Sequence, residues 1–154
     1  MRIAIASDHA AIELKAILHE WLLEDGHEVA DLGPKTDKSV DYPDYGYDLA
    51  AVVAEGTAEF GVALCGSGIG ISIAVNRNPG VRCALAWSEE TARLGREHND
   101  ANVVSVGGRP FEVHDDQGRR HSAWAVTGRP RRSSARADRN GSSQSRSRGA
   151  GTGA

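Results

Sequence analysis

The chain has 154 residues, of which 40% are hydrophobic and 25% charged. This composition indicates one soluble globular domain, and the length is too short for two domains of ordinary size. No apolar run approaches the roughly 20 residues of a membrane-spanning helix, and the first residues lack a signal-peptide pattern. The two cysteines, Cys65 and Cys83, are too few for a disulfide framework. We therefore expect a cytoplasmic protein with reduced cysteines and no membrane partner.

Charge divides the chain into two parts. Residues 1–110 hold 9 Lys and Arg against 17 Asp and Glu, whereas residues 111–154 hold 9 Arg against 4 acidic residues. The second part has no Leu, Ile or Lys and is rich in Arg, Ser and Gly, so it cannot bury enough apolar surface to fold alone. We expect a folded domain over residues 1–110 and a tail over 111–154, with disorder from about residue 128.

An Arg-rich tail can contact the phosphates of a nucleic acid, but a solvated tail is the commoner outcome. Residues 1–110 carry no stripe of basic and aromatic residues that would continue such a surface. We therefore expect no nucleic-acid partner.

Short apolar runs alternate along the chain with stretches of helical spacing. The runs are Ile3 to Ala6, Val29 to Leu32, Val62 to Leu64, Cys83 to Ala86 and Val103 to Val106. This alternation predicts an α/β fold, a Rossmann-like three-layer α/β/α sandwich around a five-stranded parallel sheet. The segment Asp41-Tyr42-Pro43-Asp44-Tyr45 precedes the second helix, and we expect Asp44 to cap that helix.

Parallel sheets of this kind bind ligands beyond the carboxyl ends of their strands. The segments that follow the runs are Ser7-Asp8-His9, Gly33-Pro34, Cys65 to Gly70, Trp87-Ser88 and Gly107-Gly108-Arg109. His98 and Asn99 instead precede the fifth run, so we expect them at the opposite end of the sheet. They would reach the site only from another subunit.

Three alternating glycines, Gly66, Gly68 and Gly70, follow the third run. Glycine lets backbone N–H groups approach an anion where a helix begins, so the segment predicts an oxyanion or phosphate cradle. The alternative is a tight turn that binds nothing. A dinucleotide site would need a glycine where Ile71 stands, so we expect no nicotinamide cofactor.

Cys65 directly precedes this cradle, where the start of a helix stabilises a thiolate, so it is a candidate base or nucleophile. The alternative is a small buried hydrophobe, the inert role that we expect for Cys83. No Cys-x-x-Cys or His-Glu-x-x-His spacing occurs, and we expect no metal. Asp8-His9 and His98-Asn99 add groups suited to proton transfer or phosphate contact, although Asp8 can also simply cap a helix.

Five segments in chain order resemble a known family. They are Ser7-Asp8-His9-Ala10, Asp41-Tyr42-Pro43, Cys65 to Ala74 with Asn76, Arg96 to Val103, and Gly107-Gly108-Arg109. Over about residues 1–109 the chain resembles ribose-5-phosphate isomerase type B and its sister, galactose-6-phosphate isomerase.

The resemblance implies a cofactor-independent aldose–ketose isomerase that opens a furanose ring and moves a proton between C1 and C2 through a cis-enediolate. It implies that Cys65 is the base, that Ser67 holds the enediolate together with the loop N–H groups, and that His98 is the acid for ring opening. The substrate-binding residues that it implies are Asp8, His9, Tyr42, Gly66, Gly68, Ile69, Gly70, Asn99 and Arg109. Some relatives replace the cysteine with Gly and carry Glu at the position of Ile71, so this chain resembles the cysteine type.

The resemblance also implies a sugar-phosphate substrate and a homodimer or homotetramer with shared active sites. Ribose 5-phosphate is favoured because the galactose 6-phosphate enzyme usually needs two different chains. After Arg109 the family continues with a long amphipathic helix and a phosphate-binding Gly-Arg-His-x-x-Arg segment, which Gln117 to His121 matches only faintly. Loss of this segment would impair activity, and a sugar-phosphate-binding remnant is the alternative function.

A frameshift is one hypothesis for the abrupt change of composition after about residue 110. We expect the coding DNA, read in the other two frames, to encode an amphipathic helix beyond this point. Coding DNA without such a helix in any frame would contradict the hypothesis.

Overall fold

Apolar runs of the sequence form the strands of one sheet in which every neighbouring pair is parallel. A computed structural model of the chain describes residues 1–109. The strands are β1 (Arg2–Ser7), β2 (Glu28–Asp31), β3 (Phe60–Cys65), β4 (Cys83–Leu85) and β5 (Val103–Gly107). Each strand end lies within two residues of its prediction, because strands buried on both faces read as continuous apolar runs.

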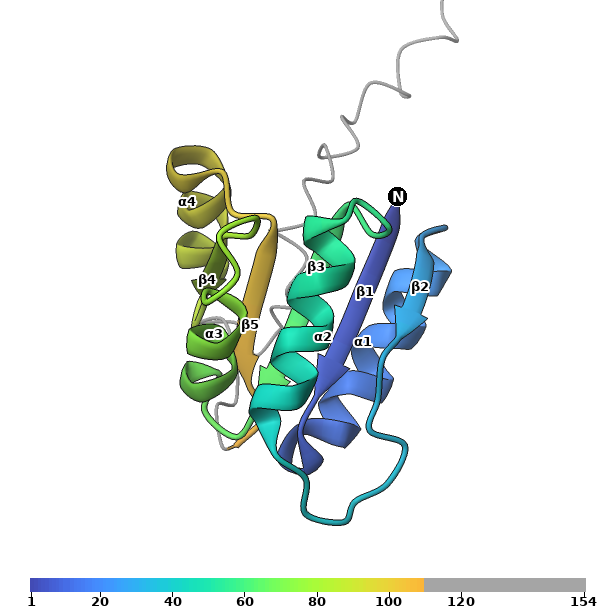
Figure 1. Cartoon of the computed structure of the whole chain (residues 1–154). Coiled ribbons are helices and arrows are strands. Elements are labelled where there is room, and N and C mark those ends of the chain that lie inside the picture. The colour runs from blue at the N-terminus through green and yellow to red at the C-terminus, as the bar shows by residue number, and fades with distance from the viewer. Residues whose placement is uncertain (110–154) are drawn as a thin grey trace, which may run out of the picture.

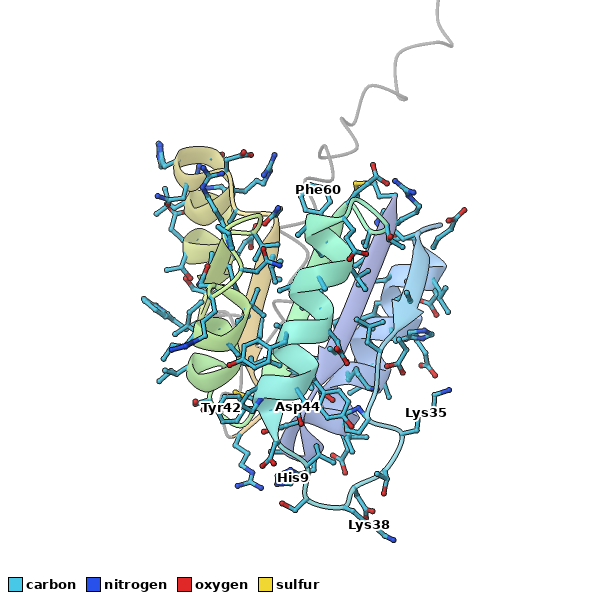
Figure 2. The ribbon with its side chains drawn as sticks, viewed as in Figure 1. His9, Lys35, Lys38, Tyr42, Asp44 and Phe60 are labelled. Atoms are coloured by element: carbon cyan, nitrogen blue, oxygen red, sulfur yellow. The ribbon has the colours of Figure 1, made fainter. Side chains whose placement is uncertain are left out.

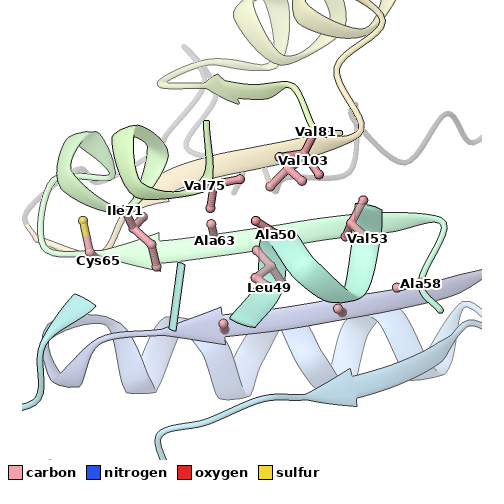
Figure 3. Packing of buried hydrophobic residues seen from close by; sticks show 12 residues of the cluster. Leu49, Ala50, Val53, Ala58, Ala63, Cys65, Ile71, Val75, Val81 and Val103 are labelled. Carbon is pink, nitrogen blue, oxygen red and sulfur yellow. The ribbon is translucent and has the colours of Figure 1, made fainter. Parts of the chain in front are cut away.

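The helices form a layer on each face of this sheet (Figure 1). They are η1 (His9–Ala11), α1 (Ile12–Glu24), α2 (Tyr42–Ala54), α3 (Ile69–Val75) and α4 (Glu89–Asn99). Leu49 of α2 and Val75 of α3 pack with Ala63 on one face, where Figure 3 shows the cluster. Leu18 of α1 and Ala92 of α4 pack on the other face. The predicted three-layer α/β/α sandwich is confirmed.

In the strand order β2-β1-β3-β5-β4, the chain adds strands outward on one side of β1 and then on the other side. The topological switch point therefore lies between β1 and β3. From β1 the chain moves outward to β2 and then crosses back to β3. Open α/β sheets bind ligands at such a point, beyond the carboxyl ends of the strands. Ser7 pairs with Leu64 there, and the Asp8 N–H donates to the Leu64 carbonyl at 3.0 Å. The ends of β1 and β3 are therefore in register at the expected binding edge.

The start of α2 differs from the prediction that Asp44 caps it. The helix begins at Tyr42, with Asp41 in the N-cap position and Pro43 in the first turn, so Asp44 lies inside the helix. Proline fits this position because its fixed φ suits a helix and the first turn does not need its missing N–H. Tyr42 is thus part of a helix that packs on the sheet.

No helix within residues 1–109 combines the length and apolar character needed to cross a membrane. The tail expected over residues 111–154, with its expected disorder from about residue 128, lies outside the described residues.

An ion pair between a buried lysine and a partly exposed aspartate holds the segment after β2 against the end of β1. Lys15 of α1 is only 4% exposed, and its Nζ donates to Asp31 Oδ1 at 2.6 Å and to the Pro34 carbonyl at 2.9 Å. The same Asp31 oxygen accepts the Gly33 N–H at 2.8 Å, and the Gly33 carbonyl accepts the Ser7 N–H at 3.0 Å. Burial raises the pKa of Asp31, but the hydrogen bonds from Lys15 and Gly33 and the charge of Lys15 outweigh it and hold that pKa below its ordinary value.

We expect Asp31→Asn to lower the free energy of unfolding by about 2 kcal/mol at neutral pH, because the buried Lys15 ammonium loses its charged acceptor. The folded-state pKa of Asp31 lies below its unfolded value. The stabilisation is therefore present above the unfolded pKa of about 3.9 and is lost as pH falls through the folded pKa. Urea unfolding as a function of pH measures both effects. Asp37→Asn, in the exposed part of the same segment, is the control, and an Asp31→Asn variant as stable as that control contradicts the prediction.

Candidate active site

Residues from three distant parts of the sequence meet beyond the carboxyl ends of β1, β3 and β5. The Gly108 N–H donates to the Cys65 carbonyl at 2.8 Å, and the Arg109 N–H donates to the Gly66 carbonyl at 2.9 Å. Figure 2 shows His9 and Tyr42 at this same end of the molecule, with Phe60 at the other. The predicted candidates that follow these strands therefore share one edge of the sheet.

The loop between β3 and α3 folds back onto the Cys65 thiol. Cys65 is 4% exposed, and its Sγ accepts the Gly68 N–H at 3.1 Å. The next N–H, from Ile69, donates to Ser67 Oγ at 3.2 Å. Two N–H groups that the sequence assigned to an anion cradle are thus held by side chains of the loop itself. The Gly68 N–H serves the sulfur rather than a ligand.

Gly68 makes this fold of the loop possible. Its φ of +78° lies in the left-handed region, which side chains rarely adopt. A Cβ at this position would also lie 2.8 Å from Leu85 Cδ1 and 3.0 Å from the Gly107 nitrogen. Both the backbone conformation and the close approach of β5 require glycine here.

Cys83 differs from Cys65 in its surroundings. It packs partly buried against the α2 and α3 side of the core, and burial raises the pKa of its thiol to about 12. Its backbone is held by Asn76, whose amide accepts the Cys83 N–H at 2.8 Å and donates to the Cys83 carbonyl at 2.9 Å. A thiol with a raised pKa is a poor nucleophile, which agrees with the prediction of an inert Cys83.

Asp8 and His9 both make local hydrogen bonds at the end of β1. Asp8 is 7% exposed, and its Oδ1 accepts the Ala10 N–H at 2.8 Å, so it caps η1 as the sequence allowed. The half-buried His9 accepts the Val40 N–H on Nδ1 at 3.2 Å. A neutral His9 ring with an acceptor at Nδ1 carries its proton on Nε2. His9 can therefore donate a hydrogen bond from Nε2.

Tyr42 and Arg109 lie on the glycines of the loop. A Cβ at Gly70 would be 2.7 Å from Tyr42 Cζ, so the tyrosine ring lies directly against the Gly70 backbone. A Cβ at Gly66 would be 3.8 Å from Arg109 Cδ, which is ordinary contact. Both side chains are exposed. The structure thus places each of these two predicted binding residues against the loop, Tyr42 at Gly70 and Arg109 at Gly66.

His98 and Asn99 stand at the opposite end of the sheet. They are exposed residues of the last turn of α4. The Arg96 guanidinium lies 5.3 Å from the centre of the Phe60 ring, and Phe60 begins the strand that Cys65 ends. A six-residue strand spans about 17 Å. One protomer therefore does not bring His98 to Cys65, as the sequence predicts.

An apolar hollow of about 260 Å³ adjoins the loop. It is lined by Ser67, Ile69, Leu85, Ala86, Trp87, Val106 and Gly107. Trp87 is 64% exposed, Ile69 is 52% exposed and Ile73, one turn further along α3, is 60% exposed.

Within residues 1–109, no group of three or more His, Cys, Asp or Glu side chains could hold a metal ion.

Sequence reasoning missed Ser105, which is 0% exposed and donates from Oγ to the Gly68 carbonyl at 2.6 Å. A signal was present, because Ser105 is the one polar residue in the apolar run from Val103 to Val106. The His9–Val40 bond left no such signal, because any residue except proline supplies a main-chain N–H.

We expect Gly68→Ala to destabilise the protein by about 3 kcal/mol or more, from the strained φ and from the collision with Leu85 and β5. Gly56→Ala is the matched control, since Gly56 has a similar φ of +75° and a Cβ added there would meet nothing within 4 Å. Gly56→Ala should lower the free energy of unfolding only by the cost of the backbone conformation, about 1 kcal/mol. Thermal and urea unfolding of both variants measure the difference, and equal losses contradict the packing argument.

The family model for Ribose/Galactose Isomerase matches residues 3–136 of the chain. Ribose-5-phosphate isomerase B of Mycobacterium tuberculosis is 44% identical over 114 residues, which cover 73% of this chain and 70% of that protein. Ribose-5-phosphate isomerase B of Escherichia coli is 40% identical over 108 residues, covering 70% and 72%.

Solved structures agree with these relatives. Ribose-5-phosphate isomerase B of Thermotoga maritima superposes with a TM-score of 0.72 at 43% identity, covering 82% of each chain. The enzyme of Mycoplasma genitalium, solved with bound ribulose-5-phosphate, gives a TM-score of 0.67 at 41% identity, covering 70% of this chain and 72% of that one. The fold, the order of the motifs and the sequence identity lead to one conclusion: this chain belongs to the ribose/galactose isomerase family.

Proposed function

We propose that this chain is an aldose–ketose isomerase that interconverts ribose 5-phosphate and ribulose 5-phosphate without a cofactor. The observation that carries the proposal is the position of the Cys65 thiol. The Gly68 N–H holds this thiol at the carboxyl end of β3, beside the topological switch point of the sheet. The relatives are named ribose-5-phosphate isomerase B. Their names favour the pentose phosphate over galactose 6-phosphate.

Cys65 is the base in this reaction. As a thiolate it takes the proton from C2 of the open-chain aldose, the C–H electron pair forms a double bond between C1 and C2, and the carbonyl oxygen O1 takes the negative charge. The hydroxyl proton on O2 then passes to O1, and the thiol returns its proton to C1. The ketose forms with no electrons gained or lost, so the step needs no redox cofactor.

The neighbouring side chains stabilise the charges of the substrate. The Ser67 hydroxyl accepts the Ile69 N–H, which leaves its own O–H to donate to the enediolate oxygen. His9 Nε2 and the Arg109 guanidinium donate to the phosphate. Asp8 uses one carboxylate oxygen to cap η1 and has the other for a sugar hydroxyl, beside the exposed Tyr42 ring.

A second copy of the chain supplies His98 and Asn99 to each site in this proposal. Two observations support a homodimer: the distance of His98 from Cys65 within one protomer, and the exposed apolar side chains of Ile69, Ile73 and Trp87 beside Ser67. An apolar surface of this kind is typical of a contact between subunits. Burying it would also exclude water from the enediolate. A cytoplasmic location agrees with the reduced thiol that the base requires.

Isomerisation of ribose 5-phosphate by the full chain tests the proposal. We expect turnover by the wild type and a loss of about 100-fold or more in Cys65→Ala and in His98→Asn, because each removes an acid or base. Cys83→Ala is the control for cysteine loss and should keep its activity. Turnover of galactose 6-phosphate alone would contradict the substrate, and binding of ribose 5-phosphate without turnover would indicate a remnant.

Mixing the two inactive variants tests whether the site is shared between subunits. In a mixed dimer, one site combines Cys65 of one chain with His98 of the other. A mixture of Cys65→Ala and His98→Asn at equal amounts, allowed to exchange subunits, should regain about a quarter of wild-type activity. A mixture as inactive as its components contradicts the shared site, provided that light scattering shows dimers.

A further inference from the structure

Ser105 is a fully buried hydroxyl in the middle of β5. It lies on the same face of the sheet as Val103, the face that α2 and α3 cover. Its Oγ donates to the Gly68 carbonyl at 2.6 Å. A hydroxyl with no access to water needs such a partner, because an unpaired one would lose its hydrogen bonds to solvent on folding. The Ser105–Gly68 bond therefore persists as long as the strand and the loop are folded.

The Gly68 carbonyl and the Ile69 N–H belong to one planar peptide group and point in opposite directions. A donor that fixes the carbonyl therefore also aims the N–H. Ser105 holds this carbonyl from one side, and the Ile69 N–H points to Ser67 Oγ at 3.2 Å on the other. The hydroxyl in β5 thus acts on Ser67 through one rigid unit.

The same anchor acts on Cys65 through the other side of Gly68. Glycine has no side chain to restrict rotation, so its N–H and its carbonyl are free to reorient unless contacts hold them. The Gly68 carbonyl accepts Ser105 Oγ and the Ser72 N–H, which lies at 3.1 Å, and the Gly68 N–H donates to Cys65 Sγ. Ser105 supplies the one side-chain anchor of this carbonyl among the described residues.

We propose that Ser105 is a positioning residue of the isomerase loop: its hydroxyl fixes the Gly68–Ile69 peptide group and so keeps Cys65 Sγ and Ser67 Oγ on their N–H donors. It touches neither the substrate nor the reacting atoms. The kinetic consequence rests on the proposed function, whereas the effect on the loop can be measured without substrate.

Amide hydrogen exchange in the full chain, followed by NMR, measures the loop directly. We expect Ser105→Ala to speed exchange of the Ile69 and Gly68 amides by about tenfold. These amides exchange when the loop opens locally, and in the variant this opening costs less free energy because the Ser105 hydrogen bond is absent. Ser72→Ala is the matched control: Ser72 is also buried, and its Oγ donates to the Ile69 carbonyl at 2.7 Å. It should leave these two amides within about twofold of the wild type.

Amides of Val62 in β3 report whether a variant is destabilised as a whole. The proposal is wrong if Ser105→Ala speeds amide exchange at Val62 as much as at Ile69. It is also wrong if the exchange rate of the Ile69 amide does not change. If Ser105→Ala does not fold, Ser105→Cys replaces the hydroxyl with a weaker donor of similar shape. It should then show a smaller acceleration at Ile69 and Gly68, and no acceleration overturns the proposal.

Kinetics separate the positioning role from a structural one. Because the two N–H groups position the Cys65 sulfur and the Ser67 hydroxyl for the proposed reaction, Ser105→Ala should lower kcat by about tenfold with KM for ribose 5-phosphate nearly unchanged. Ser105→Cys should recover part of this loss, and Ser72→Ala should keep its kcat. An equal loss in Ser72→Ala overturns the specific role of Ser105. If the wild type has no activity, the proposed function fails, while the exchange measurement still decides the role of Ser105.

Discussion

The left-handed backbone of Gly68 is the constraint on which the loop between β3 and α3 depends. It allows the chain to turn so that one N–H returns to Cys65 Sγ while the following carbonyl reaches Ser105. The turn also brings the loop so close to Gly107 that no side chain fits between them. The Cys65 sulfur is therefore placed by two neighbouring strands of the sheet, β3 and β5.

Much of this arrangement is predictable from the sequence, for physical reasons. The strands were predicted because parallel strands buried on both faces leave apolar runs, and Cys65 was identified because its run ends in a glycine-rich turn. The strand order was not predicted, since it depends on pairings between segments far apart in the chain, such as Ser7 with Leu64. The prediction that Asp44 caps α2 is wrong, because proline is allowed both before a helix and in its first turn, and here Pro43 lies in the first turn. The hydrogen bonds of the loop N–H groups to Cys65 and Ser67 could not be predicted from the sequence, because they depend on atomic positions in the folded loop.

The two ends of the protomer carry different parts of the proposed chemistry. The thiol, Ser67 and Arg109 lie at the carboxyl ends of the strands, while His98 lies where α4 returns to β5. Stability and activity are then linked, because apolar side chains beside the loop are left exposed in a single chain. Association would bury these side chains and complete the site in the same step.

The Asn76 amide has a consequence for whether another strand can add to the sheet. It occupies both the N–H and the carbonyl of Cys83 on β4, which is an edge strand of the sheet. The opposite edge strand, β2, begins and ends with the acidic residues Glu28 and Asp31. Natural proteins use such charged or blocked edges to prevent other strands from adding to a sheet. Within residues 1–109, both edges of the sheet are therefore protected against the addition of a further strand.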